Sequence, residues 1–326
     1  ALGKSMNKKI LDFIKKKNKT KIVTLTAYSK NIASILDKFC DLILVGDSLG
    51  SVLYNYKSTR EVTLNTMIEH SKSVRMGIKK KNKSKIVSLT AYSKNVASII
   101  DNFCDIILVG DSLGSVLYNY KSTREVTLNT MIEHSKSVRM GIKKSLMIVD
   151  MPHNTYRNSK EALKNAKLII KKTKCDGVKL EGGKKIIKSV KTLVKNNITV
   201  MGHIGVLPQS DKTFKFKGKK KSEKENIIRD AELLEEAGVF SIVLECIETS
   251  LAKQITKSIN VPTIGIGASN NCDGQILVFD DLIGLNPIEV RFVKKYTNIK
   301  KEISKAVSKY SSEVKTKRFP SKKYSY

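Results

Sequence analysis

Short apolar runs alternate with longer amphipathic stretches along most of this 326-residue chain. The runs are rich in Val, Ile and Leu and are nearly continuously apolar, which is typical of strands covered on both faces. Regular alternation of strand and helix favours a parallel sheet. We predict strands at 22–27, 41–46, 86–91, 105–110, 146–151, 177–181, 199–203, 240–245, 263–267 and 275–279. We predict helices at 7–17, 29–39, 63–75, 127–139, 159–172, 184–195, 224–237 and 250–258.

The pattern repeats itself near the N-terminus. Residues 15–78 and 79–142 have almost the same sequence, with 58 of 64 positions identical. Five of the six differences are Thr/Ser, Ile/Val or Leu/Ile exchanges, and only the change from Lys38 to Asn102 alters the charge. Each copy carries a strand that runs into Gly-Asp-Ser-Leu-Gly, so the chain contains a candidate site and its duplicate.

The number of strands favours an α/β fold, the (β/α)8 TIM barrel, with an N-terminal duplicated β-α-β-α segment. The second copy and the six strands after it give eight βα units, which is the number in that barrel. Both copies together give ten strands, so one copy is supernumerary. A doubly wound open sheet is the main alternative, but no GxGxxG motif opens a helix after the first strand.

We expect the second copy to supply the barrel. It runs into the strand at 146–151 through residues 143–145, a connection of ordinary length, whereas use of the first copy would leave 64 residues looped out. The predicted domains are therefore an N-terminal helix and duplicate at 1–78 and a catalytic barrel at 79–326. The segment 7–17, the natural helix to close the barrel bottom, precedes only the first copy.

Four of the predicted barrel strands end in an acidic residue, namely Asp111, Asp150, Glu181 and Glu245. In a parallel barrel these ends meet at one rim, where barrel enzymes carry their chemistry. A single such residue usually caps a helix or contacts a loop, but four clustered carboxylates repel one another and need a cation between them. Hard oxygen ligands suit Mg²⁺, with waters and substrate oxygens completing the shell.

Two basic side chains are predicted to share this rim. Lys179 lies two residues before Glu181 and points to the same face of its strand, as a clamp for a substrate anion or as a structural ion pair. His203 ends another strand and fits a core histidine as well as a substrate contact. The residues alone favour a Mg²⁺-dependent enzyme that removes a proton next to the carbonyl of a small oxo-acid.

Composition adds a large positive charge. The net charge of +31 is typical of nucleic-acid binding, but lysine supplies most of it, the lysines are spread along the chain, and aromatics are only 6%. We therefore expect no specific nucleic-acid partner. No apolar run reaches 18 residues, which predicts no membrane span, and five cysteines without a CxxC pair favour reduced thiols in the cytoplasm.

A series of short motifs occurs in a fixed order. The motifs are Thr-Ala-Tyr at 90–92, Val-Gly-Asp-Ser-Leu-Gly at 109–114, Val-Lys-Leu-Glu-Gly-Gly at 178–183, Gly-His-Ile-Gly at 202–205 with Pro-Gln at 208–209, Leu-Glu-Cys at 244–246, and Gly-Ile-Gly-Ala at 265–268 with Asp-Gly-Gln at 273–275. Over about residues 85–310, and again over the first copy, the chain resembles the ketopantoate hydroxymethyltransferase (3-methyl-2-oxobutanoate hydroxymethyltransferase) family.

The resemblance implies a barrel that transfers a hydroxymethyl group from 5,10-methylenetetrahydrofolate, the co-substrate, to 3-methyl-2-oxobutanoate. The product is 2-dehydropantoate, and the implied route is a Mg²⁺-stabilised enolate. Carried over, Asp111, Asp150 and Glu181 form the Mg²⁺ site, and Glu245 is the acid/base residue. Ser112 and Lys179 hold the oxo-acid together with Asp111 and Asp150. The resemblance further implies small-molecule substrates and a homo-oligomer, typically a decamer.

Two departures from the family pattern leave alternatives open. Segment 210–221 is shorter and more basic than the usual lid region, which would favour a polyglutamylated folate. The duplication could disrupt the barrel or its assembly, which would make the chain an inactive scaffold. Another Mg²⁺-dependent oxo-acid enzyme, of the phosphoenolpyruvate/isocitrate-lyase type, is the remaining alternative, although such enzymes typically use a catalytic cysteine or a different acidic cluster.

Overall fold

The computed structural model describes residues 24–27, 42–45, 48–54, 57–77, 85–211, 215–287 and 289–326. The chain divides into two compact units, residues 1–81 and residues 82–326. The helices predicted at 7–17 and 29–39 lie outside the described residues, as does Asp47, the duplicate of Asp111.

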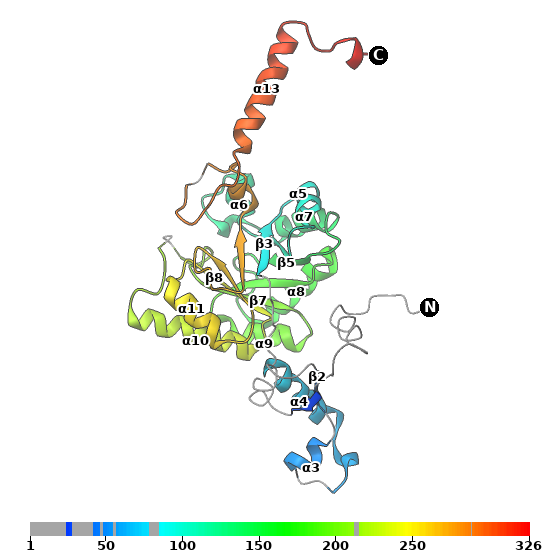
Figure 1. Cartoon of the computed structure of the whole chain (residues 1–326), viewed down its shortest axis with the longest axis vertical. Helices are drawn as coiled ribbons and strands as arrows, with labels where there is room; N and C mark the ends of the chain where they lie inside the picture. Colours follow the sequence, from blue (N-terminus) through cyan, green and yellow to red (C-terminus); the bar gives the residue numbers. More distant parts are fainter. Residues whose placement is uncertain are drawn as a thin grey trace. The chain divides into compact units, whose positions relative to one another are not determined.

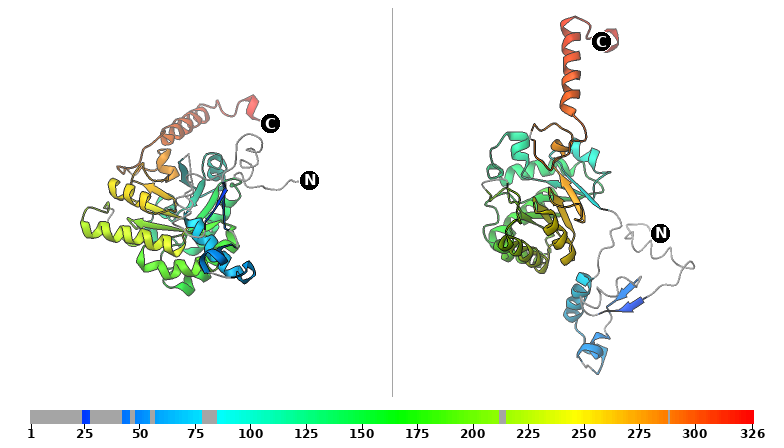
Figure 2. Two further views of the ribbon diagram at one scale, coloured as in Figure 1. Left: turned by 60° about the horizontal axis from the view of Figure 1, so that its bottom comes forward. Right: turned by 60° about the vertical axis from the view of Figure 1, so that its left-hand side comes forward.

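The second unit contains a closed barrel of eight parallel strands in the order β10-β3-β4-β5-β6-β7-β8-β9, which confirms the predicted TIM barrel (Figure 1, Figure 2). The strands are β3 (Ile86–Thr90), β4 (Ile106–Val109), β5 (Leu146–Asp150), β6 (Gly177–Glu181), β7 (Val200–Gly205), β8 (Ser241–Glu245), β9 (Thr263–Ile266) and β10 (Gly274–Leu277). Strands β3 and β4 belong to the second copy, which therefore supplies the start of the barrel, as the short connection at 143–145 predicts.

Helices follow most of these strands and cover the outside of the barrel. They are α5 (Lys94–Ile100), α6 (Leu113–Tyr118), α7 (Leu128–Arg139), α8 (Ser159–Thr173), α9 (Ile187–Lys195), α10 (Lys221–Ala237), α11 (Thr249–Ser258), α12 (Phe279–Leu282) and α13 (Ile299–Lys315). The sequence pattern did not predict α6, α12 or α13. Helix α13 has no buried residue among those described, and its apolar side chains Ile303, Val307 and Tyr310, which recur at helical spacing, are exposed.

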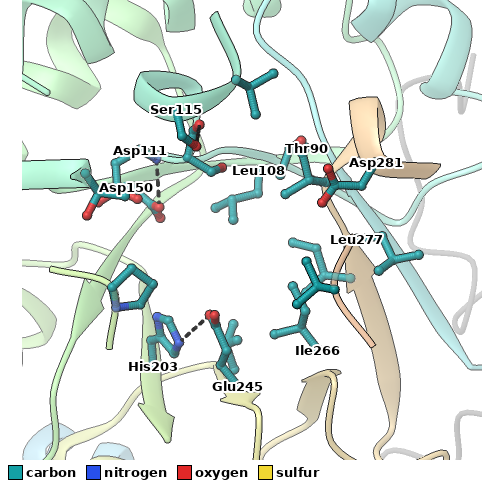
Figure 3. Close-up of a pocket in the computed structure, with 18 of the residues that line it drawn as sticks. Thr90, Leu108, Asp111, Ser115, Asp150, His203, Glu245, Ile266, Leu277 and Asp281 are labelled. Carbon is teal, nitrogen blue, oxygen red and sulfur yellow. Dashed lines mark hydrogen bonds and ion pairs between the residues drawn. The ribbon is translucent and has the colours of Figure 1, made fainter. Parts of the chain in front are cut away.

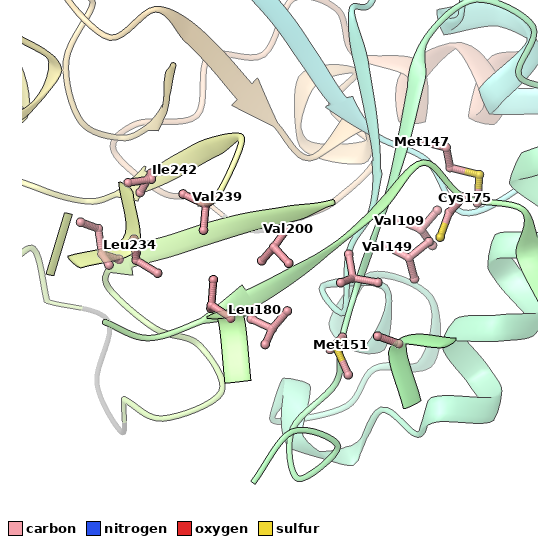
Figure 4. Packing of buried hydrophobic residues seen from close by; sticks show 14 of the residues in the cluster. Val109, Met147, Val149, Met151, Cys175, Leu180, Val200, Leu234, Val239 and Ile242 are labelled. Carbon is pink, nitrogen blue, oxygen red and sulfur yellow. The ribbon is translucent and has the colours of Figure 1, made fainter. Parts of the chain in front are cut away.

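Strands β4 to β8 bury side chains on both faces, which explains the continuously apolar runs. Ile106 and Leu108 of β4 point into the barrel with Ile148, Met201, Val243, Ile264 and Ile276. Ile107 and Val109 pack on the other face against the helices, in the larger cluster that includes Met147, Leu180 and Leu234 (Figure 4). Because side chains alternate along a strand, the residue two positions after an inward apolar residue also points inward. This parity places Asp150 after Ile148, His203 after Met201 and Glu245 after Val243.

The first unit shows the same local structures without the same burial. Strands β1 (Thr24–Thr26) and β2 (Leu42–Leu44) form a parallel pair, followed by α3 (Leu49–Tyr54) and α4 (Leu64–Gly77). A capping box at Ser58 repeats the one at Ser122 of the second copy. However, the side chain of Leu44 is 50% exposed, whereas that of its equivalent Leu108 is 6% exposed. Identical local sequence therefore gives local structure in both copies but a buried core in only one.

Asp101 offers a test of which copy the barrel uses. Its buried carboxylate accepts hydrogen bonds from the backbone N–H groups of residues 143–145, the connection into β5. Although burial alone would raise the pKa of Asp101, these bonds hold it below its ordinary value. We expect Asp101→Ala to destabilise the barrel by about 1–3 kcal/mol, because several buried N–H groups lose their acceptor.

The matched control is Asp37→Ala in the first copy, for which we expect a change within about 0.5 kcal/mol in urea unfolding. Because the folded pKa of Asp101 is lowered, its contribution is present above the unfolded pKa of about 3.9 and is lost as the pH falls. Equal effects of the two substitutions, or a larger effect of Asp37→Ala, would contradict the assignment of the second copy to the barrel.

Candidate active site

A cavity of about 430 Å³ opens at the carboxyl ends of the barrel strands (Figure 3). The structure brings together in its lining all six side chains that the sequence predicted for the site: Asp111, Ser112, Asp150, Lys179, Glu181 and Glu245. Apolar side chains from the top of the barrel core, including Leu108, Val243 and Ile266, complete the wall. The cavity therefore combines a charged side with an apolar side, as a small branched organic acid requires.

Asp111 and Asp150 are adjacent and almost inaccessible to solvent. The backbone N–H of Asp111 donates to Asp150 Oδ2 at 3.1 Å, and their exposed fractions are 4% and 2%. The pKa of Asp111 is raised well above its ordinary value by burial, and then by the charges of Asp150 and Glu181. The turn after β4 also brings Ser112 close, since a Cβ at Gly110 would lie 2.9 Å from Ser112 Oγ.

Lys179 lies among these carboxylates on β6. Its Nζ is 2.9 Å from Asp150 Oδ1 and 3.4 Å from His203 Nδ1. Burial lowers the pKa of Lys179, but the charges of Asp150, Glu181 and Asp111 outweigh burial and raise it above its ordinary value. Lys179 is therefore a permanent cation inside the cavity. Its ion pair with Asp150 and a role as anion clamp are compatible, because the ammonium has three donors.

His203 bridges two further carboxylates. Its Nδ1 lies 3.5 Å from Glu181 Oε1 and its Nε2 lies 3.1 Å from Glu245 Oε2 (Figure 3). Burial and the charge of Lys179 lower the pKa of His203, but the hydrogen bonds to Glu181 and Glu245 raise it to about 9. The sequence was compatible with His203 as a core residue or as a substrate contact. The structure places its imidazole in the lining of the cavity, between two carboxylates.

The sequence analysis assigned no role to Gln209, which ties two of the carboxylates together. Its Nε2 donates to Asp111 Oδ2 at 2.7 Å, and its backbone N–H donates to Glu181 Oε2 at 3.0 Å. Arg124 holds this loop by donating to the carbonyls of Gln209 and Ser210. A glutamine in a loop has no periodic signature, and the only available signal was its place in the Pro-Gln motif after β7.

Tyr92 is a second residue that the sequence analysis left without a role. Its buried hydroxyl lies 2.8 Å from Ser112 Oγ, and burial raises its pKa above the ordinary value for tyrosine. Tyr92 therefore stays neutral and orients the Ser112 hydroxyl. The aromatic residue of the Thr-Ala-Tyr motif is thus explained by its contact with the neighbouring strand.

The donor set fits a divalent cation. Asp111, Asp150, Glu181 and Glu245 bring four carboxyl groups into one cavity, whereas Lys179 and His203 are the two basic side chains that contact them, so acidic groups outnumber basic ones. In the described part of the chain, no three His, Cys, Asp or Glu side chains are close enough together to bind a metal unaided. This arrangement suits Mg²⁺, which usually takes one or two carboxylates and fills its shell with waters and substrate oxygens.

The protonation of His203 is directly measurable. We expect its imidazole to titrate near pH 9 in an NMR titration with labelled histidine, and to titrate lower in Glu245→Gln, which removes one of its two carboxylate partners. Because the folded pKa lies above the ordinary 6.5, the stabilisation from His203 is complete below pH 6.5 and is lost as the pH rises through about 9. Titration of His203 below pH 7 would contradict this arrangement.

Comparison with known proteins agrees with the site. The family model for ketopantoate hydroxymethyltransferase matches residues 77–322 and, separately, residues 7–81. A protein of Pelagibacter ubique (strain HTCC1062) named 3-methyl-2-oxobutanoate hydroxymethyltransferase is 71% identical over 249 residues, which are 76% of this chain and 97% of that protein. A protein of the same name from Rhizobium rhizogenes is 46% identical over 246 residues, covering 74% and 90% of the two chains. A crystal structure of phosphonopyruvate hydrolase matches with 12% identity and a TM-score of 0.49, covering 74% of this chain and 88% of that one.

The extent of these matches also bears on the duplication. The unaligned 3% of the Pelagibacter ubique protein is too short to contain a second copy of 64 residues. A catalytic unit of this kind is therefore complete without the additional copy in that relative. No helix among the described residues has the length and apolar character needed to span a membrane. By sequence, fold and the side chains of its cavity, the chain belongs to the ketopantoate hydroxymethyltransferase family.

Proposed function

We propose that this chain transfers a hydroxymethyl group from 5,10-methylenetetrahydrofolate to 3-methyl-2-oxobutanoate, giving 2-dehydropantoate. The observation that carries the proposal is the convergence of Asp111, Ser112, Asp150, Lys179, Glu181 and Glu245 in one cavity of a family member. The family match at this identity leaves the alternative of a phosphoenolpyruvate/isocitrate-lyase type of enzyme without support. Both substrates are small molecules.

Asp111, Asp150 and Glu181 would hold Mg²⁺ in this site. Asp111 and Asp150 are adjacent and suit direct coordination, whereas Glu181 already accepts from Gln209 and pairs with His203, which suits contact through a water. When bound, Mg²⁺ supplies positive charge that polarises the carbonyl of the oxo-acid and makes its C3 proton more acidic.

The remaining residues bind and orient the oxo-acid. Lys179 and Ser112 would donate to its carboxylate and carbonyl oxygens, with the Ser112 hydroxyl oriented by Tyr92. The apolar wall formed by Leu108 and Val243 would accept the isopropyl group.

Glu245 would act as the acid/base residue. His203 Nε2 lies 3.1 Å from Glu245 Oε2 and would orient this carboxylate to accept the C3 proton. The electron pair released at C3 forms the new carbon–carbon bond to the one-carbon unit, whose two bonds to folate nitrogens break. Water supplies the hydroxyl group of the product, and the C3 proton and the second proton of the water go to the two folate nitrogens, which gives tetrahydrofolate.

We further propose that residues 79–326 form the catalytic barrel and that residues 1–78 are supernumerary. The closed barrel built from β3 to β10 and the length of the Pelagibacter ubique relative support this division. Exposed apolar residues on α13 support a homo-oligomer, for which the family resemblance suggests a decamer. The four cysteines in the described part of the chain are all free thiols, which supports a cytoplasmic location.

The duplication allows a paired test of the function. We expect wild-type protein to form 2-dehydropantoate only with both Mg²⁺ and methylenetetrahydrofolate. Asp111→Asn should reduce the rate by about 10³-fold or more, because it removes a charged ligand from the metal site. Asp47→Asn, the same change in the first copy, should leave the rate unchanged, as measured by product formation. Loss of product formation in Asp47→Asn would mean that the first copy completes the barrel. A wild-type protein without activity would favour the alternative of an inactive scaffold disrupted by the duplication.

The role of Glu245 can be tested without the folate. In D₂O with Mg²⁺, the C3 hydrogen of 3-methyl-2-oxobutanoate should exchange, and Glu245→Gln should slow that exchange by about 10²–10⁴-fold because it removes the base. Glu232→Gln, at an exposed glutamate of α10, is the control and should exchange at the wild-type rate. Exchange at the wild-type rate in Glu245→Gln would exclude Glu245 as the base.

A further inference from the structure

One buried carboxyl group in the lining of the active-site cavity has no part in the function proposed above. Asp281 belongs to α12, which follows β10, and its carboxyl group points into the cavity across from Asp111 and Asp150 (Figure 3). The residue is only 9% exposed. Asn286 Nδ2 donates to Asp281 Oδ1 at 2.8 Å, whereas Oδ2 has no hydrogen-bond donor among the described residues. A buried carboxyl oxygen without a partner, next to a cavity, is suited to take a proton from a molecule in that cavity.

Asp281 is held in place from both ends of its short helix. The backbone N–H of Phe279 donates to Thr90 Oγ1 at 3.1 Å, which ties the start of α12 to the neighbouring strand β3. The backbone N–H of Tyr296 donates to the carbonyl of Leu282 at 2.8 Å, which ties down the other end. A carboxyl group on a turn anchored in this way keeps a fixed direction, as a group that transfers a proton requires.

The proposed reaction moves two protons that need an acceptor in this cavity. Glu245 takes the first proton, from C3 of the oxo-acid. The second proton comes from the water, which must lose it as the water oxygen bonds to the one-carbon unit. Since Glu245 has to be unprotonated to accept the C3 proton, a second acceptor is needed close to the same carbon atom.

The lining offers one carboxyl group that is free for this task. In the described part of the chain, the carboxyl side chains of the lining are Asp111, Asp150, Glu181, Glu245, Asp281 and Glu289. The first three form the proposed metal site, and Glu245 serves C3. The side chain of Glu289 is 87% exposed and its Oε1 lies 3.8 Å from Lys295 Nζ, so this carboxylate belongs to the solvated rim. Asp281 therefore remains.

The surroundings of Asp281 also strengthen it as a base. Burial raises the pKa of its carboxyl group above the ordinary value, although the hydrogen bond from Asn286 and the charge of Lys295 lower it. A carboxylate with a raised pKa holds a proton more tightly than one in water, which favours proton transfer to it.

We propose that Asp281 is the general base for the water that supplies the hydroxyl group, an inference that rests on the proposed function. Asp281 Oδ2 would accept a proton from this water while the water oxygen bonds to the carbon of the one-carbon unit. One bond from that carbon to a folate nitrogen breaks, and its electron pair stays on the nitrogen. Asp281 then gives its proton to this nitrogen, and the C3 proton held by Glu245 goes to the other folate nitrogen. Both carboxylates are thereby regenerated in each turnover.

Two reactions separate this role from that of Glu245. Asp281→Asn keeps the size of the side chain and an oxygen for Asn286 Nδ2, and it removes only the base. We expect it to lower the rate of 2-dehydropantoate formation from methylenetetrahydrofolate by about 10²-fold, with the KM of both substrates retained. Exchange of the C3 hydrogen in D₂O with Mg²⁺ should continue at the wild-type rate, because Glu245 performs it. The matched control is Asp280→Asn, at a neighbour outside the lining, which should behave as wild type in both reactions.

Formaldehyde as the one-carbon donor tests the role of water directly. It already carries the oxygen of the hydroxyl group, and the C3 proton held by Glu245 can protonate that oxygen, so no second base is needed. We therefore expect Asp281→Asn to form 2-dehydropantoate from formaldehyde, 3-methyl-2-oxobutanoate and Mg²⁺ as fast as the wild-type protein does.

The combined results distinguish this inference from the proposed function. A lower rate with methylenetetrahydrofolate, with C3 exchange and the formaldehyde reaction retained, supports Asp281 as the base for water. A wild-type rate with methylenetetrahydrofolate overturns it, and so does a rise in KM alone, which would indicate a binding role. An equal loss in all three reactions also overturns it, since a structural defect would then explain the effect. If the wild-type protein shows no C3 exchange, the proposed function itself fails.

Discussion

Burial of negative charge at the mouth of the barrel is the constraint on which the rest of the site depends. Four carboxyl groups are buried there: Asp111, Asp150, Glu181 and Glu245. Buried carboxyl groups are tolerated only where cations and hydrogen-bond donors compensate for the lost contact with water. Lys179 and His203 supply two charges, and Gln209 supplies donors to Asp111 and Glu181. Carboxylates still outnumber basic side chains in this group, an environment that suits a divalent cation.

The barrel explains why these side chains meet. Alternation along β5, β7 and β8 directs Asp150, His203 and Glu245 inward, each two positions after a core residue. The apolar layer beneath them excludes water and forms the floor of the cavity. The same geometry that packs the core therefore carries the side chains of the site at its upper end.

The duplicated segment shows which structural features the local sequence determines by itself. Both copies form a parallel strand pair and the same capping box, because those structures depend on neighbouring residues alone. Leu44 and Leu108 occupy equivalent positions of the two copies, but they differ in burial because β4 has the rest of the barrel to pack against. Tertiary context, not propensity, determines which copy contributes to the core.

For the same reason, the sequence predicted the barrel and its carboxylates better than the contacts between them. A continuously apolar strand that ends in Asp or Glu can be recognised in the amino-acid sequence. The strands could therefore be predicted, together with four acidic residues at their ends: Asp111, Asp150, Glu181 and Glu245. The bridging position of His203 could not, because it depends on which strands are neighbours. Gln209 and Tyr92 act through hydrogen bonds between parts of the chain that are far apart in sequence, so neither leaves a periodic signal.

The most direct test of this account is the number of metal sites on the chain. Titration with Mn²⁺ in the presence of 3-methyl-2-oxobutanoate, followed by electron paramagnetic resonance, counts tightly bound ions per chain. The account predicts one site in the wild-type protein and none in Asp150→Asn, since Asp150 has no duplicate. Two sites in the wild type, or one site that survives in Asp150→Asn, would contradict the carboxylate cluster at the barrel mouth as the metal centre.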